Sequence, residues 1–142
     1  MEIIPQPISS AEIIGLFSLH DDFTIDFLGE DSVYYTRYSP SENIEAAWIA
    51  YLVNLPVACI AYRTKTNGIG EVKRMFIAEG HRGQGLSKPL LSTVQDHAKS
   101  KNIHTLYLST RITLEPAISL YRKFGFTEVF CKDLYVEMEK SI

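Results

Sequence analysis

The sequence lacks an excess of positive charge and any long hydrophobic run. Its formal net charge is -3 at pH 7, which argues against a general nucleic-acid binder, because such a protein needs a basic face that neutralises phosphates. No apolar run approaches the ~20 residues that a helix needs to cross a bilayer. Residues 1–5 also lack the positive charge and apolar stretch of a signal peptide. We therefore expect neither a nucleic-acid partner nor a membrane partner.

Cysteine is scarce and histidine shows no pattern. Cys59 and Cys131 each lie in a separate apolar, strand-like segment, and the simplest interpretation is a reduced, cytoplasmic compartment. The histidines have no spacing typical of metal ligands, so we expect no metal site. They are His20, His81, His97 and His104.

Low-complexity tracts, repeats and linkers are also missing, so the chain offers no position at which to divide it. With 142 residues, 46% hydrophobic and 22% charged, it has the size and composition of one globular domain over residues 1–142. A chain of this length buries roughly two thirds of its unfolded surface.

The N-terminal third predicts a strand and then a helix. Residues 2–5 form a short apolar strand, and Ser9-Ser10-Ala11-Glu12 has the spacing of a capping box at a helix start. Ile13, Ile14 and Phe17 follow at spacings that predict one helical face. Between residues 21 and 45 the pattern is unclear, with a short helix over 24–28 and a polar loop through 39–41 as the plausible elements.

The remaining chain predicts alternating strands and helices. Apolar runs over 46–53 and 57–63 indicate a hairpin whose turn is 54–56, and Asn67-Gly68 indicates another turn. The further elements expected are a strand over 71–77, a helix over 86–101, a strand over 104–109, a helix over 117–124 ended by Gly125, and strands over 126–130 and 134–138. Together they predict a mixed α/β sheet with helices on both faces.

A glycine-rich turn, His81-Arg82-Gly83-Gln84-Gly85-Leu86-Ser87, joins a predicted strand to a predicted helix. Glycines allow the backbone to approach a ligand closely, and the unpaired N–H groups at a helix start suit a phosphate or pyrophosphate. Arg82 adds a charge-assisted donor. Many such turns use glycine for geometry alone, so composition leaves a purely structural role open. The spacing fits neither a P-loop nor a dinucleotide-binding turn.

Two segments resemble signatures of the GNAT family of N-acetyltransferases. Residues 82–87 are similar to the family's acyl-CoA motif Arg/Gln-x-x-Gly-x-Gly/Ala, with Arg82 and Gly85 matching and Ser87 in place of the final Gly or Ala. Residues 115–126 resemble Asn-x-x-Ala-x-x-Leu-Tyr-x-x-x-Gly-Phe with the part before Ala shortened by one, and Glu115 stands near the usual Asn. The resemblance extends from about residue 46 onward.

The resemblance implies a single N-acetyltransferase domain over residues 1–142. Its sheet would be mixed and largely antiparallel, with helices on both faces and a splayed parallel pair, residues 71–77 and 104–109. Acetyl-CoA would lie in the gap of that pair as the acetyl donor, and a neutral amine would attack it directly through a tetrahedral intermediate. The residues that the resemblance assigns to the acetyl-CoA site are Met75, Phe76, Ile77, Arg82, Gly83, Gln84, Gly85, Leu86, Ser87, Ala117 and Tyr121.

Two side chains are candidates for the proton transfers. Tyr121 matches the family tyrosine proposed to protonate the departing sulfur, although its place in an apolar helical stripe also fits core packing. Glu71 is the candidate base, with a solvated carboxylate at a strand end, or a base that is an ordered water, as the alternatives. The resemblance gives the oxyanion donor as a backbone N–H near Phe76 or Ile77.

The acceptor site is the least determined part. Tyr34, Tyr35 and Arg37 could bind an acceptor that carries a carboxylate, or they could cap the sheet. An acidic stretch could attract a cationic amine, or could be solvated surface; it comprises Asp21, Asp22, Asp26, Glu30 and Asp31. Trp48 and Tyr51 lie on a predicted strand and are expected in the core.

Three functions stay open at this point. The first is acetylation of a small-molecule amine such as an amino acid or polyamine, and the second is acetylation of protein lysines or N-termini. An open groove around residues 20–45 would favour the second. The third is an acyl-CoA-binding sensor or interaction module without turnover, which Ser87 and Glu115 would fit and the retained Tyr121 would not. By the same resemblance, a homodimer paired through the last strands is possible.

Overall fold

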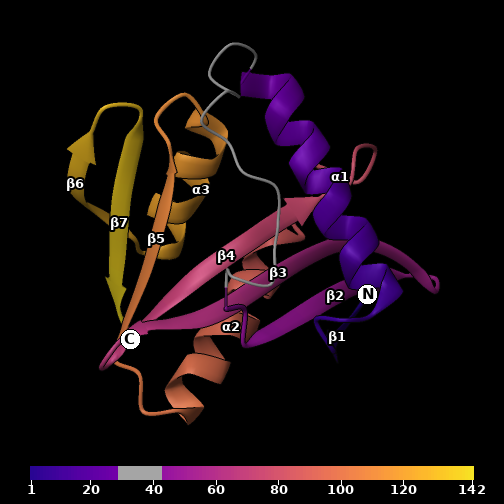
Figure 1. The fold of residues 1–142 in the computed structure, drawn as a ribbon, viewed down its shortest axis with the longest axis horizontal. Coiled ribbons are helices and arrows are strands. Elements are labelled where there is room, and N and C mark those ends of the chain that lie inside the picture. Colours follow the sequence, from indigo (N-terminus) through magenta and orange to yellow (C-terminus); the bar gives the residue numbers. More distant parts are fainter. Residues whose placement is uncertain (29–42) are drawn as a thin grey trace.

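The computed structural model of the chain describes residues 1–28 and 43–142 (Figure 1). Within them the strands form one seven-stranded sheet in the order β1-β2-β3-β4-β5-β7-β6. The pairings are antiparallel except that between β4 and β5, which confirms the mixed, largely antiparallel sheet. The elements are β1 (Glu2–Gln6), α1 (Ala11–Leu28), β2 (Ala46–Leu52), β3 (Leu55–Thr66), β4 (Ile69–Ile77), α2 (Ser87–Ser100), β5 (Thr105–Arg111), α3 (Glu115–Phe124), β6 (Thr127–Lys132) and β7 (Tyr135–Ser141).

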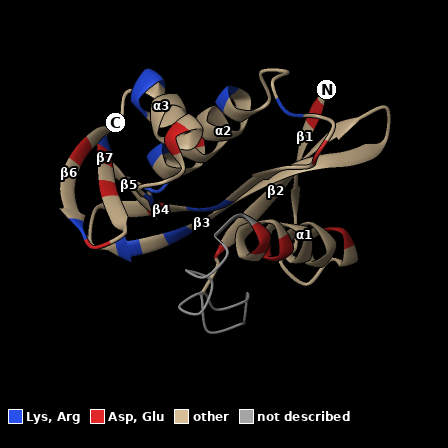
Figure 2. Ribbon diagram, turned by 90° about the horizontal axis from the view of Figure 1, so that it is seen from above, with Lys and Arg blue, Asp and Glu red and all other residues tan. Residues whose placement is uncertain are grey.

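Helices cover both faces of the sheet. Figure 2 shows α1 on one face and α2 with α3 on the other. On the α2 and α3 face, the buried stripe of α2 packs into the larger core cluster, and that stripe is Leu90, Leu91, Val94 and Ala98. On the opposite face, Ile13, Leu16 and Phe17 of α1 pack against β2, β3 and β4 in a second cluster. The sheet is therefore the middle layer of three.

The larger cluster holds the single tryptophan and a fully buried tyrosine. The Trp48 ring meets the edge of the His97 ring on α2, with centroids 5.0 Å apart, and Tyr62 contacts the same histidine at 5.0 Å. The Tyr62 hydroxyl lies 3.2 Å from the Thr64 hydroxyl. The core position expected for Trp48 is confirmed, whereas Tyr51 is half-buried and its hydroxyl donates to Glu12 at 2.9 Å.

Helix α1 differs from the sequence prediction in three ways. Its cap is Ser10, whose Oγ accepts a hydrogen bond from the Ile13 N–H at 3.1 Å, so the cap lies one residue later than Ser9. Ile14 is 50% exposed, because the buried face runs through positions 13, 16 and 17. The short helix over 24–28 is the end of one continuous helix, Ala11–Leu28.

The first hairpin turns earlier than predicted. Its two-residue turn is Val53-Asn54, both at positive φ (49° and 65°), which matches the twist of the flanking strands. Leu55 and Pro56 therefore belong to β3, which runs for 12 residues. A valine at positive φ is unusual, because its branched side chain clashes with the backbone there, and this is why sequence reasoning placed the turn on the following residues.

The parallel pair parts soon after it begins. β4 and β5 pair only from Ile69–Glu71 opposite Thr105–Tyr107. Just beyond this pairing, β4 carries a bulge. Two residues lie between Lys73 and Phe76, whereas the opposite segment of β3 has one residue between their partners. Arg74, inside the bulge, has φ 54°. A bulge bends its strand and increases the local twist, so the bulge directs β4 away from β5 (Figure 1). The expected splayed pair is confirmed.

A buried ion pair links α1 to this bulge. The Arg74 guanidinium donates to the Asp21 carboxylate, and both side chains are 5% exposed. The sequence allowed two interpretations of the acidic stretch, attraction of a cationic amine and a solvated surface. Neither applies to Asp21, because its carboxylate is buried against Arg74. Asp22 and Asp26 are exposed, and Glu30 and Asp31 lie outside the described residues.

The strand β6 forms one edge of the sheet. All six residues of β6 are exposed, and it is the last strand of the sheet, so its outer edge is the surface that pairing through the last strands would cover. Among the described residues, no helix is both long enough and apolar enough to span a bilayer.

Two glycine substitutions should shift stability in opposite directions. A Cβ at Gly70 would meet the ring of the buried Tyr62, with the hydroxyl oxygen 2.8 Å away, so Gly70→Ala should destabilise the protein by about 1–3 kcal/mol. At Gly15, inside α1, a Cβ meets nothing within 4 Å, so Gly15→Ala should stabilise it by roughly 0.5–1 kcal/mol. Urea unfolding of both variants measures the difference, and equal effects would contradict the close approach at Gly70.

Candidate active site

A cleft of about 710 Å³ opens where β4 and β5 part, within the usual range for ligand pockets. Its walls come from α1, β4, the glycine turn, β5, α3 and β7. Of the residues that the sequence singled out, those lining it are Glu71, Met75, Phe76, Ile77, Arg82, Gly83, Ser87, Ala117 and Tyr121. Gln84 and Gly85 are exposed in the same turn, and Leu86 is buried in the core.

The glycine turn is open and poorly capped. Gly83 and Gly85 have φ of 74° and 76°, and a Cβ on either would meet nothing within 4 Å, so the space beside them is free. Helix α2 follows at Ser87, and the preceding Leu86 provides no side-chain cap. The first N–H groups of a helix need partners, and an anion supplies them. The turn thus fits a phosphate or pyrophosphate group.

Arg82 connects this turn to two other walls. Its Nε donates to the Ile77 carbonyl oxygen at 3.0 Å, and its guanidinium carbon lies 4.3 Å from the centre of the Phe23 ring on α1. The sequence predicts Arg82 as a phosphate ligand. In the structure it lines the cleft, with its guanidinium against an aromatic ring.

The end of β4 presents a backbone N–H to the cleft. The Ala78 N–H donates to the Val57 carbonyl on β3 at 2.8 Å, and hydrogen-bonded pairs alternate along an antiparallel ladder. Phe76 therefore directs its N–H and carbonyl toward β3, whereas Ile77 directs both away from it. The Arg82 contact to the Ile77 carbonyl agrees with this orientation. Of the two residues considered for an oxyanion donor, the ladder favours Ile77.

Tyr121 is both packed and at the cleft. It is 8% exposed, and its ring meets the edge of Phe126 with centroids 5.9 Å apart. Burial raises its pKa to about 12, because the charged phenolate loses hydration. Its hydroxyl therefore stays protonated at neutral pH and can act as a proton donor. Tyr121 thus packs in the core and also lines the cleft, and its role as the acid stays a prediction.

Glu71 is not the solvated strand-end carboxylate that one interpretation gave. β4 begins two residues earlier, at Ile69, and Glu71 is 5% exposed. Its Oε1 accepts a hydrogen bond from Arg63 Nε at 2.9 Å. The residue pairs with Tyr107 where the two parallel strands are still joined. It therefore lies at the closed end of the cleft as a paired carboxylate.

Sequence reasoning missed the wall that α1 provides. His20, Phe23 and Thr24 line the cleft. His20 follows Ile13 by seven residues and Thr24 follows Phe17 by seven, so a continuous helix places both on the buried face; the unclear pattern after residue 21 concealed this. The candidate acceptor residues Tyr34, Tyr35 and Arg37 lie outside the described residues.

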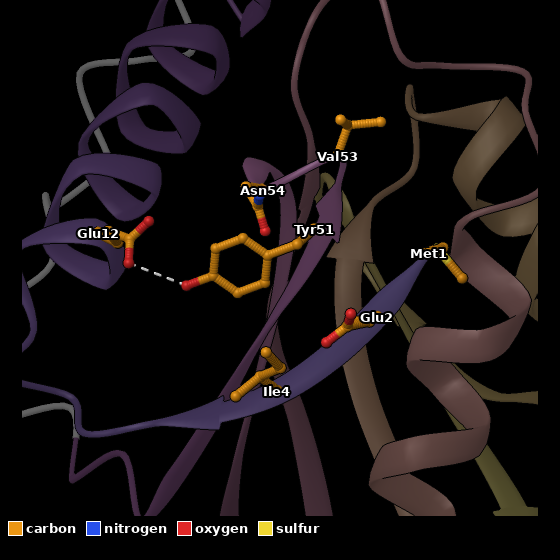
Figure 3. Close-up of a pocket in the computed structure, with 7 residues that line it drawn as sticks. All are labelled: Met1, Glu2, Ile4, Glu12, Tyr51, Val53 and Asn54. Atoms are coloured by element: carbon orange, nitrogen blue, oxygen red, sulfur yellow. Dashed lines mark hydrogen bonds between the residues drawn. The ribbon is translucent and has the colours of Figure 1, made fainter.

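A second hollow, of about 330 Å³, lies at the β1 edge of the sheet (Figure 3). The dashed line in the figure is the hydrogen bond from Tyr51 to Glu12. No residue of β4 or of the glycine turn lines it, so it is separate from the cleft. Within residues 1–28 and 43–142, no group of three metal-ligating side chains is close enough to hold an ion.

A sheet that parts at a parallel pair, with an uncapped helix start beside the gap, is the architecture that the resemblance to N-acetyltransferases implies for an acyl-CoA-binding α/β domain. Family comparison makes this specific. Residues 15–126 match the model of the acetyltransferase (GNAT) family, and the chain belongs to that family.

Individual relatives agree with the family. An IAA acetyltransferase of Azospirillum brasilense is 38% identical over 73 residues, which is 51% of this chain and 48% of the relative. A streptothricin acetyltransferase of Streptomyces lavendulae is 33% identical over 60 residues, 42% of this chain and 31% of the relative. The chain thus spans less than half the length of the curated relatives it matches.

Solved structures cover more of the fold. A crystal structure from Klebsiella pneumoniae is 28% identical, with a TM-score of 0.77 over 99% of this chain and 96% of the other. A GNAT acetyltransferase from Elizabethkingia anophelis, solved with acetyl-CoA bound, has a TM-score of 0.76 at 17% identity, over 99% of this chain and 97% of that one. At 17% identity, the similarity to the Elizabethkingia structure shows a shared fold.

Proposed function

We propose that the chain is an acetyl-CoA-dependent N-acetyltransferase that acts on a primary amine of a small molecule, such as an amino acid or a polyamine. The cleft between β4 and β5 carries the proposal, because it joins the glycine turn to Tyr121 and Glu71. The glycine turn suits the phosphates of an acyl donor. Tyr121 offers a proton donor, and Glu71 offers a carboxylate.

The residues present fit acetyl-CoA. The open turn at 83–87 would hold its pyrophosphate, and its pantetheine arm would lie along the cleft wall that includes Met75 and Ala117. Acetyl-CoA supplies an activated acetyl group as a thioester. The Elizabethkingia structure with acetyl-CoA bound supports the same donor.

Three groups of the chain would serve the transfer. The Tyr121 hydroxyl, protonated at neutral pH, is the donor for the leaving sulfur. The Ile77 N–H stabilises negative charge on the carbonyl oxygen, and such a preorganised donor is worth about 3 kcal/mol. Glu71 and Ile77 lie six residues apart on β4, which is roughly 20 Å of extended strand. Glu71 would therefore receive the proton of the amine through ordered water, and one of its carboxylate oxygens already accepts from Arg63.

The names of the relatives favour a small acceptor. They include an IAA acetyltransferase, a mycothiol acetyltransferase and a streptothricin acetyltransferase. The second candidate, protein acetylation, is supported by the fold of a ribosomal-protein-alanine N-acetyltransferase from Brucella melitensis, with a TM-score of 0.78 at 17% identity. An open groove around residues 20–45 would favour it, and residues 29–42 of that range lie outside the described residues.

The test is a product screen. The protein is incubated with acetyl-CoA and a panel of amino acids, polyamines and peptides with free N-termini or lysines, and released thiol and acetylated product are measured. We expect a small amine to be acetylated, with Gly85→Glu inactive as control. Products from peptides alone would favour the second function. Stabilisation by acetyl-CoA without any product would indicate a binding module instead.

A further inference from the structure

The α1 wall of the cleft contains a histidine that the proposed chemistry does not use. His20 lines the cleft, and its ring stacks on Phe76 with centroids 5.4 Å apart and planes 29° apart. Phe76 stands between the bulge at Arg74 and Ile77, whose N–H faces the cleft. The imidazole is therefore held beside the part of β4 where the acetyl group would react.

One nitrogen of this ring has no partner. His20 Nδ1 is buried without a hydrogen bond to any described residue. The Thr24 hydroxyl, one turn further along α1, donates to the backbone carbonyl of His20 instead, at 2.9 Å. A buried polar group without a partner is rare and costs stability. Because Nδ1 is shielded from solvent in this conformation, a ligand in the cleft reaches it only after a half-turn of the ring about the Cβ–Cγ bond, which keeps the stacked plane.

The imidazole is neutral at physiological pH. Burial, and then the positive charge of Arg74, lower the His20 pKa to about 4; Lys73 acts in the same direction and Asp21 opposes it. A neutral imidazole has one N–H donor and one free acceptor nitrogen. Such a group is a weak base, because its conjugate acid is far more acidic than an ammonium ion, but it accepts hydrogen bonds at pH 7.

We propose that His20 binds the attacking amine: the unprotonated nitrogen of its imidazole accepts a hydrogen bond from the amine N–H and holds the amine beside Phe76. This inference rests on the proposed acetyltransferase function. It makes His20 an acceptor-binding residue, and leaves removal of the amine proton to Glu71 or a water. Stacking on Phe76 fixes the plane of the ring, so the hydrogen bond to the amine lies in that plane.

The primary test is spectroscopic and needs no knowledge of the natural acceptor. Protein labelled with ¹⁵N-histidine is saturated with CoA, which cannot acetylate, and ethylamine is added as a small primary amine. We expect an upfield shift of the unprotonated His20 nitrogen resonance with ethylamine, and none with tetramethylammonium, which has no N–H. An unchanged resonance, or equal shifts with both, would overturn the proposal.

Variants add a kinetic test. His20→Phe keeps a flat ring on Phe76 and removes both nitrogens, so kcat/KM for ethylamine should fall by about 10- to 100-fold. His20→Asn and His20→Gln place an amide near one or the other nitrogen position, and at least one should recover most of that loss. The rise in melting temperature with acetyl-CoA should be the same in all of them.

The failures can be told apart. If acetyl-CoA and CoA do not stabilise the parent protein, the proposed function itself fails. If they stabilise the parent and His20→Phe equally, yet kcat/KM is unchanged, only the role of His20 is wrong. A loss of the acetyl-CoA effect in His20→Phe would show that the histidine supports the cleft through packing, which also contradicts amine binding.

Discussion

Gly85→Glu is expected to abolish the stabilisation that acetyl-CoA gives the protein, whereas Gly80→Glu keeps it. Gly85 belongs to the open turn before α2, where a side chain would fill the space beside the free N–H groups and a carboxylate would repel a pyrophosphate. In the parent, a ligand that binds only the folded state adds ~2.7 kcal/mol at about one hundred times its dissociation constant. Thermal unfolding with increasing acetyl-CoA measures this.

Gly80 is a closely matched control. Both glycines have positive φ, 91° and 76°, and a Cβ at either meets nothing within 4 Å. The backbone strain of the substitution, roughly 1–2 kcal/mol, and the added charge are therefore alike in both variants. A dose-dependent rise that persists in Gly85→Glu, or one that disappears in both, would show that the turn has only a structural role.

Tyr121→Phe is expected to lower turnover by at least about 10²-fold while acetyl-CoA binding persists. A well-placed acid is worth roughly 10²–10⁴ in rate, and we propose the Tyr121 hydroxyl, at the cleft wall, as that acid. Phenylalanine fills nearly the same volume and keeps the edge-on contact with Phe126, so the fold should lose less than about 1.5 kcal/mol. The measurement is released thiol at saturating amine.

The matched control is Tyr62→Phe, which also removes a buried hydroxyl, in this case one that faces Thr64 and lines no part of the cleft. Its turnover should stay near the parent value. The pKa of Tyr121, raised to about 12, has a further consequence: the acid form is lost only as pH rises through that value, so Tyr121 causes no decline in rate between pH 6 and 10. Turnover unchanged in Tyr121→Phe would remove the residue from the mechanism.

The sequence predicted the parts of the cleft that have local signatures. The glycine turn at 82–87 and the segment 115–126 carry recognisable residues at fixed spacings, and they identified the family and the sheet with its parallel pair. The order of strands and helices also followed from apolar periodicity, which reflects burial directly.

The missed features depend on contacts between distant residues. Asp21 has the appearance of a surface residue, and only its pairing with Arg74, 53 positions later, explains its burial. The bulge at Arg74 has no glycine to mark it, and the turn at Val53 has a residue that disfavours positive φ. His20 lines the cleft because α1 is one continuous helix, and the sequence pattern did not predict that continuity.

The place of the single tryptophan determines what its fluorescence can report. Trp48 is buried against His97 of α2, in the cluster that joins the sheet to that helix, and it lines neither the cleft nor the hollow at the β1 edge. We therefore expect its emission to follow the integrity of the sheet–helix layer rather than direct contact with a ligand in the cleft. Tryptophan fluorescence should therefore report unfolding of the protein in the presence as well as in the absence of acetyl-CoA.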